Sequence, residues 1–185
     1  LPDGRELERG QFPAALPHSV TSLVPTQMAR LVESPAALEW LRGFRAVFVG
    51  GAPAWDALLA RARSERIPLA PCYGMTETAA QITMLHPPEF LAGHSGVGRT
   101  LPHATVDIVD DAGTSLPRGN NGRICIRARS LFLGYYPASG SGPDHFCPQD
   151  LGRIEADGGL TILGRADDVV NRGGEKGHPA GVEGE

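Results

Sequence analysis

Short apolar stretches alternate with helical stretches in the first half of the chain, and this alternation constrains the fold more than any other feature. Residues 20–24, 46–49 and 67–72 are predicted to be buried strands. Between them, apolar side chains recur at helical spacing, first after Pro25 and again after Ser34, an N-cap residue that is followed by proline. The pattern predicts an α/β fold in which a mostly parallel sheet is covered by flanking helices.

The pattern changes after about residue 90, where short strands follow one another without helices between them. Residues 106–109 and 123–128 alternate apolar and polar positions, and Asp157–Gly159 has the composition of a hairpin turn. These features predict a small antiparallel, β-barrel-like subdomain. We therefore expect three regions: an α/β subdomain over residues 1–90, an antiparallel β subdomain over 91–163, and a glycine-rich hinge with the start of another domain over 164–185.

The composition is that of an ordinary globular protein, and it excludes several functional classes. Of the 185 residues, 41% are hydrophobic and 21% are charged, which is sufficient for a sizeable core. A net charge of −4 and an aromatic content of 6% argue against a nucleic-acid partner. No apolar run approaches the ~20 residues that span a bilayer, and the N-terminus lacks the basic and apolar regions of a signal peptide.

The three cysteines, Cys72, Cys125 and Cys147, are widely spaced. No C-x-x-C pair occurs, and none of the six histidines lies at metal-ligand spacing from a cysteine. We therefore expect neither a disulfide framework nor a zinc site, and we predict a reducing, cytoplasmic location.

The run Tyr73–Thr78 (Tyr-Gly-Met-Thr-Glu-Thr) is the most informative motif for function. It follows a predicted strand, and Gly74 is expected to let the backbone turn tightly. Thr76 can donate to a phosphate oxygen, Glu77 can ligate Mg²⁺, which prefers oxygen ligands, and Tyr73 offers a flat face to a base. Taken alone, the motif fits equally well a strand followed by a helix that has Thr76 as its N-cap.

Further motifs accompany this run. They are residues 50–53 (Gly-Gly-Ala-Pro), 150–152 (Asp-Leu-Gly), 164–168 (Gly-Arg-Ala-Asp-Asp) and 173–176 (Gly-Gly-Glu-Lys). In this order and spacing, they resemble the adenylate-forming family of acyl-CoA synthetases, luciferases and peptide-synthetase adenylation domains. The resemblance covers nearly the whole chain. Residues 22–27 and 41–45 make the chain most similar to the 2-succinylbenzoate–CoA ligases of menaquinone and phylloquinone biosynthesis.

The resemblance implies a site for ATP or AMP with Mg²⁺. The implied nucleotide-binding residues are Gly50, Gly51, Ala52, Pro53, Cys72, Tyr73, Gly74, Met75, Thr76, Asp150 and Arg165. Among these, Tyr73 would stack on adenine and Asp150 would accept the ribose hydroxyls. Thr76 and Glu77 would be the catalytic pair, with Thr76 on the α-phosphate and Glu77 on the metal.

The remaining implied residues serve the other substrates. Asp167 would be the hinge of a rotating C-terminal domain, and Gly173 and Gly174 would form a loop near CoA, the co-substrate. Thr26, Gln27 and Gln81 are the candidates for the acyl pocket. The implied reaction joins a small-molecule carboxylic acid to CoA through an acyl-adenylate.

Two features of the family are missing from this sequence. The first is the serine-, threonine- and glycine-rich phosphate loop that ends in Lys-Gly, and the second is the C-terminal domain with its catalytic lysine. We therefore expect a fragment of the family's large N-terminal domain that does not adenylate at a useful rate alone. A truncated sheet exposes apolar area, so a homo-oligomer is also expected.

Two other functions stay open at this point. One is an adenylation module that loads a carrier protein, and the other is a non-catalytic remnant that binds a nucleotide or an acyl ligand. A plain dinucleotide-binding fold is disfavoured, because no G-x-G-x-x-G opens a helix after a strand.

One departure from the family pattern lies next to a candidate residue. Before Asp150, Pro148 and Gln149 replace the family's usual Thr-Gly pair. Proline fixes φ and removes a backbone donor, so this pair bears on the placement of Asp150.

Overall fold

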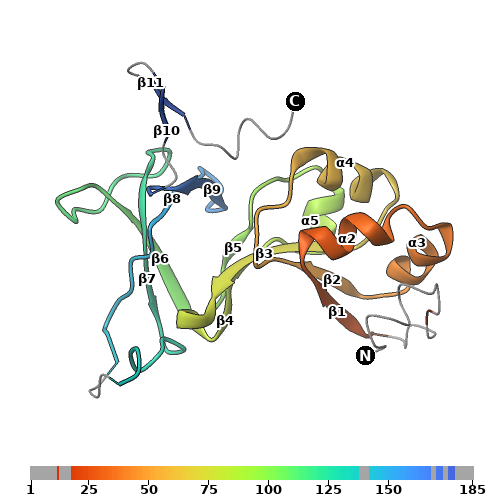
Figure 1. Ribbon diagram of the computed structural model, residues 1–185, viewed down its shortest axis with the longest axis horizontal. Coiled ribbons are helices and arrows are strands. Elements are labelled where there is room, and N and C mark those ends of the chain that lie inside the picture. The colour runs from red at the N-terminus through yellow and green to blue at the C-terminus, as the bar shows by residue number, and fades with distance from the viewer. Residues whose placement is uncertain (1–11, 13–17, 138–141, 168–169, 173–174, 178–185) are drawn as a thin grey trace. The chain divides into compact units, whose positions relative to one another are not determined.

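The computed structural model describes residue 12 and residues 18–137, 142–167, 170–172 and 175–177, which belong to two compact units (Figure 1). The first unit lies within Leu1–Pro71 and His86–His94, and the second within Cys72–Leu85 and Ser95–Glu185. Strand β3 crosses from one unit to the other. Among the described residues, no helix is both long and apolar enough to cross a membrane.

The first unit is a parallel sheet with helices around it. The strands β1 (Val20–Leu23), β2 (Ala46–Val49) and the first residues of β3 (Leu69–Met75) pair in parallel in this order. The helices are α2 (Pro25–Leu31), α3 (Pro35–Arg42), α4 (Asp56–Ser64) and α5 (Pro87–Leu91). Figure 1 shows them gathered around β1 and β2. The predicted α/β fold is confirmed.

Local sequence explains where these helices begin and which face they bury. Pro25 and Pro35 occupy first-turn positions, where a missing N–H costs nothing. The Ser34 side chain accepts a hydrogen bond from the Ala37 N–H at 3.4 Å, as the sequence predicts for an N-cap. The apolar faces of α2, α3 and α4 are buried through Met28, Leu31, Leu38, Leu41, Leu58 and Ala62.

The second unit is antiparallel throughout its described strands. The end of β3, β4 (Ala80–Met84) and β5 (Arg99–Thr100) pair in that order, with the 3₁₀ turn η1 (Thr76–Thr78) between β3 and β4. A four-stranded sheet follows, made of β6 (Ala104–Val109), β7 (Gly122–Ala128), β8 (Asp150–Ile154) and β9 (Leu160–Arg165). The last two strands, β10 (Val170–Arg172) and β11 (Glu175–Gly177), pair with each other.

One apolar cluster holds the second unit together. Its buried members come from β4, β6, β7 and β9, and they are Ile82, Val106, Ile108, Ile124, Ile126 and Leu160. The Asp157–Gly159 turn connects β8 to β9 as predicted. The predicted antiparallel subdomain is therefore confirmed, whereas its exact boundaries stay a prediction.

Three expectations are wrong. Gly74 does not turn the chain but lies inside β3, where a Cβ atom would come within 2.2 Å of the Ala80 carbonyl oxygen. Gly164 and Arg165 belong to β9 and not to a linker. A disulfide joins Cys125 to Cys147, because the pairing of Ile126 with Phe146 brings the two cysteines side by side.

Candidate functional site

The Gly-Gly-Ala-Pro loop lies at the end of β2 in the first unit. Gly50 follows Val49, the residue that pairs with Pro71 of β3, and the Gly50 N–H donates to the Leu23 carbonyl at 3.4 Å. Gly51 has a φ of +80°, which glycine adopts without strain. Residues 51–53 are exposed, so this loop presents backbone and small side chains to solvent.

The acyl-pocket candidates are divided between the two units. Thr26 and Gln27 lie in the first turn of α2 in the first unit, and both are exposed. The Gln27 side-chain oxygen accepts a hydrogen bond from the Val24 N–H at 3.0 Å, so its amide caps its own helix. Gln81 lies half-buried in β4 of the second unit, where it pairs with Gly74. Their role in binding the acyl group stays a prediction.

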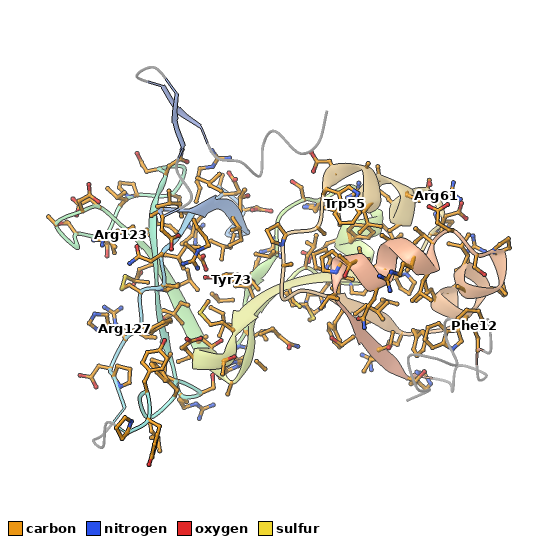
Figure 2. All side chains as sticks on the ribbon, in the orientation of Figure 1. Phe12, Trp55, Arg61, Tyr73, Arg123 and Arg127 are labelled. Carbon is orange, nitrogen blue, oxygen red and sulfur yellow. A yellow bond between two sulfur atoms is a disulfide. The ribbon has the colours of Figure 1, made fainter. Side chains whose placement is uncertain are left out.

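Three of the predicted nucleotide-binding side chains meet in the second unit. Tyr73, which is labelled in Figure 2, donates from β3 to Asp150 Oδ2 at 2.5 Å. Arg165 Nη1 lies 3.6 Å from Asp150 Oδ1. These residues belong to β3, β8 and β9. Strands β8 and β9 pair with each other, whereas β3 belongs to another sheet, so the bond from Tyr73 to Asp150 joins two sheets.

Strand register accounts for the contact between Asp150 and Arg165. Asp150 is the direct partner of Arg165 in the β8–β9 pair, and the Ala166 N–H donates to the Gln149 carbonyl at 2.6 Å. The unusual Pro148 and Gln149 therefore leave Asp150 inside a regular strand. Arg165 also binds both carboxylate oxygens of Asp167, at 2.8 Å from Nε and 2.7 Å from Nη2.

The charges of this cluster follow from its hydrogen bonds. Burial raises the pKa of Tyr73 well above its usual range, and the hydrogen bond to Asp150 raises it further, so the phenol stays protonated and donates. The hydrogen bond from Arg165 lowers the pKa of Asp167. The cluster thus combines a neutral aromatic ring, carboxylates and a guanidinium.

Thr76 and Glu77 lie in the turn η1, directly after β3. Thr76 is exposed and begins the turn, while Met75 holds the N-cap position, so the alternative with Thr76 as the N-cap of an α-helix is wrong. Glu77 is half-buried, and its Oε1 accepts a hydrogen bond from the Tyr135 hydroxyl at 2.6 Å. That bond lowers the pKa of Glu77 and keeps the carboxylate ionised.

The Glu77 carboxylate suits a magnesium ion that is bound mainly by its substrate. No group of three or more His, Cys, Asp or Glu side chains in the described part of the chain could hold a metal. Mg²⁺ in phosphate-transferring sites is commonly held by one or two carboxylates, with water and phosphate oxygens completing its octahedron. One ionised carboxylate beside an exposed hydroxyl therefore fits this type of site.

The other predicted residues have simpler surroundings. Cys72 is half-buried in β3, and burial raises the pKa of its thiol, which fits a packing role. Met75 is half-buried and packs against the apolar cluster of the second unit. Gly173 and Gly174 lie outside the described residues. Sequence reasoning missed Tyr135, because no local pattern links it to a glutamate 58 positions earlier.

Comparison with known proteins identifies the family of the chain. The sequence matches the family described as AMP-binding enzyme over residues 14–136. The chain belongs to this family. A curated relative, the 2-succinylbenzoate–CoA ligase of Bacillus licheniformis, is 31% identical over 171 residues, which cover 89% of this chain and 35% of that protein.

Solved structures of a Bacillus subtilis o-succinylbenzoate CoA synthetase agree with this assignment. The complex with its acyl-adenylate intermediate has a TM-score of 0.77 and 29% identity, covering 90% of this chain and 35% of that one. The complex with ATP and a magnesium ion has a TM-score of 0.74 and 26% identity, covering 97% and 37%. This chain thus spans little more than a third of these relatives.

Proposed function

We propose that this chain forms the nucleoside-facing part of an AMP-forming acid–CoA ligase. One observation carries the proposal. The Asp150 carboxylate contacts both the Tyr73 hydroxyl and the Arg165 guanidinium, and the three residues come from three strands. A ring, a carboxylate and a guanidinium are the groups that recognise a base, a ribose and a phosphate. Membership of the AMP-binding family and the ligase relatives support the same reading.

Each residue of this cluster has a distinct role in the proposed complex. The half-buried Tyr73 ring stacks on adenine while its hydroxyl holds Asp150. Each carboxylate oxygen has two lone pairs, so Asp150 can accept the ribose hydroxyls and keep its bond to Tyr73. Arg165 adds a positive charge for the ribose or the phosphate, and residues 50–53 line the adenine with backbone.

Thr76 and Glu77 act at the phosphate in this proposal. The exposed Thr76 hydroxyl donates to an α-phosphate oxygen while the substrate carboxylate attacks the α-phosphorus. The ionised Glu77 would hold Mg²⁺, which when bound offsets the phosphate charge. The protein itself contributes position and fixed charge, which convert the encounter of acid and nucleotide into an intramolecular step.

The finer proposal concerns the other substrates. The acid is 2-succinylbenzoate, contacted by Thr26, Gln27 and Gln81, and CoA then displaces AMP beside Gly173 and Gly174. Asp167 serves as the hinge of a C-terminal domain. ATP and CoA are substrates of cytoplasmic metabolism, so we place the protein in the cytoplasm, where a Cys125–Cys147 disulfide would be unusual.

Calorimetry tests the nucleotide proposal. AMP should bind this chain, and a non-hydrolysable analogue of the 2-succinylbenzoyl adenylate should bind more tightly. Asp150→Ala should weaken both by at least about tenfold, because it removes a charged hydrogen-bond acceptor. Asp107→Ala is the matched control, since Asp107 binds only the exposed Arg127 among the described residues. Binding of neither ligand, or equal loss in both variants, would contradict the proposal.

Pyrophosphate exchange tests the expectation that this chain is catalytically incomplete. With ATP and 2-succinylbenzoate, the chain alone should exchange pyrophosphate far more slowly than a full-length ligase. An exchange rate near that of the Bacillus subtilis enzyme would overturn this expectation. Light scattering of the same sample would test the predicted homo-oligomer, for which Val20, Trp55 and Leu133 are exposed apolar candidates.

A further inference from the structure

The turn that carries Glu77 is fixed by its own hydrogen bonds. The Thr78 hydroxyl accepts from the Met75 N–H at 3.0 Å and donates to the Ala80 carbonyl at 2.7 Å. Thr78 is buried, and Ala79 takes the left-handed conformation with a φ of +59°. These contacts fix the Glu77 backbone, whose own N–H hydrogen-bonds to the carboxylate. The direction of the carboxylate also depends on a contact from another part of the chain.

A segment after β7 supplies that direction. The Tyr135 hydroxyl donates to Glu77 Oε1 at 2.6 Å, and the Phe132 N–H donates to the Glu77 carbonyl at 2.9 Å. The same segment therefore holds both the side chain and the main chain of one residue. Among the described residues, Tyr135 is the one other side chain that hydrogen-bonds to the Glu77 carboxylate, and the backbone N–H of Glu77 itself is its second partner.

Aromatic contacts anchor this segment to the sheet. The Phe132 ring meets the Tyr135 ring edge-on at 4.9 Å and the Phe146 ring at 5.4 Å between centroids. Phe146 in turn exchanges two backbone hydrogen bonds of 2.8 Å with Ile126 of β7. Tyr135 is 62% exposed, so its placement depends on this ring contact and on the bond to Glu77.

We propose that Tyr135 is a positioning residue that holds the Glu77 carboxylate in the orientation in which it ligates a divalent cation. This inference rests on the proposed function, in which Glu77 is the metal ligand. The hydroxyl fixes Oε1, and the remaining lone pairs of the carboxylate are the ones that would bind the metal. Groups that orient a metal ligand in this way typically change metal affinity 10- to 100-fold when they are removed.

Tyr135→Phe tests the proposal, because it removes only the hydroxyl and keeps the ring that packs on Phe132. Tyr136→Phe is the matched control, because it removes the same hydroxyl from the next residue along the chain, and Tyr136 is 99% exposed. NMR of the chain should show a single Glu77 side-chain rotamer in the wild type and the control, and rotamer averaging in Tyr135→Phe. Unchanged Glu77 rotamers in Tyr135→Phe would overturn the proposal, whether or not a metal binds.

Titration with Mn²⁺ in the presence of ATP, followed by water-proton relaxation, gives the second readout, because the proposed metal is held by phosphate oxygens together with the single Glu77 carboxylate. Tyr135→Phe should weaken Mn²⁺ binding about tenfold, and Tyr136→Phe should leave it unchanged. Glu77→Gln separates the two proposals: if this variant binds Mn²⁺ like the wild type, Glu77 is no ligand, and the metal part of the proposed function fails. If Glu77→Gln loses binding while Tyr135→Phe retains it fully, the positioning role alone is overturned.

Discussion

The candidate residues of the two units are held in different ways. In the first unit, the candidate residues are an exposed loop, in which Gly51 has a positive φ, and a glutamine that caps its own helix. In the second unit, the candidate side chains bond to one another across 58 to 77 positions of sequence. In the first unit, neighbouring residues in the sequence therefore determine how the candidate residues are held. In the second unit, strand register and contacts between segments far apart in the sequence determine it.

Two glycine substitutions should give the largest contrast between the units. Gly74→Ala in β3 would place a Cβ atom 2.2 Å from the Ala80 carbonyl oxygen and 2.5 Å from the Gln81 Cα, so backbone must move. We expect a loss of about 3 to 4 kcal/mol in the free energy of unfolding. Gly51→Ala meets only Val24 Cγ1 at 3.6 Å, and its positive φ should cost about 1 kcal/mol.

Urea titrations of both variants, followed by residue-resolved amide signals, measure this contrast. Gly113→Ala is the control for Gly51, because its φ is +82° and nothing lies within 4 Å of the new Cβ. Equal losses for Gly74→Ala and Gly51→Ala would show that close packing of β3 against β4 does not distinguish the two positions.

Reduction of the disulfide should destabilise the second unit alone. Cys125 and Cys147 close a loop with a sequence separation of 22, and loss of such a crosslink costs about 3 kcal/mol. Both tryptophans, Trp40 and Trp55, lie in the first unit, so their fluorescence reports that unit separately. We expect a reductant to lower the urea midpoint of the second unit's amide signals and to leave the tryptophan midpoint unchanged.

The double variant Cys125→Ala/Cys147→Ala serves as the control for reduction. It should match the reduced wild type in stability, and a reductant should no longer affect it. A tryptophan transition that moves as far as the amide signals would instead show that the two units unfold together.

Tyr73→Phe should have an intermediate effect. It removes the donor to Asp150, whose side chain is 15% exposed, so the carboxylate loses a charged hydrogen bond in a largely buried place. We expect a loss of about 1.5 kcal/mol in unfolding free energy and a weaker response to AMP. Tyr136→Phe should change stability by less than about 0.5 kcal/mol, and a similar loss in both variants would contradict a specific role for the Tyr73 hydroxyl.

The smallest expected effect is electrostatic and lies in the β8–β9 hairpin. Hydrogen bonds from Arg153 and then Thr161 lower the pKa of Glu155. The stabilisation is therefore present above the usual glutamate pKa and is lost as the pH falls through the folded-state value. Carboxyl NMR titration should show the pKa of Glu155 rising in Thr161→Val and rising more in Arg153→Met; the reverse order would contradict the ranking of the two bonds.

Much of the fold could be predicted from the sequence, because helix and strand periodicities are local. The cap at Ser34, the strand Ala46–Val49 and the hairpin at Asp157–Gly159 all follow from a few neighbouring residues. The prediction for Gly74 is wrong for a physical reason. A glycine after a strand usually indicates a turn, but here its missing side chain lets β4 approach β3.

The candidate site was predictable in its residues but not in its contacts. A family resemblance selects Tyr73, Asp150 and Arg165, whereas only the pairing of β8 with β9 places Arg165 beside Asp150. The bond from Tyr135 to Glu77 and the Cys125–Cys147 disulfide depend on how the chain after β7 returns to the sheet. No local pattern encodes that return.

The disulfide also changes the covalent topology of the molecule. The chain from Cys125 to Cys147 becomes a closed ring, and this ring carries both Phe132 and Tyr135, the residues that hold Glu77. A protease that cuts one peptide bond within the ring would leave a single molecule of unchanged size on a non-reducing gel. The two fragments would separate only after reduction. A nicked protein would therefore keep Phe132 and Tyr135, the residues that bond to Glu77, covalently attached.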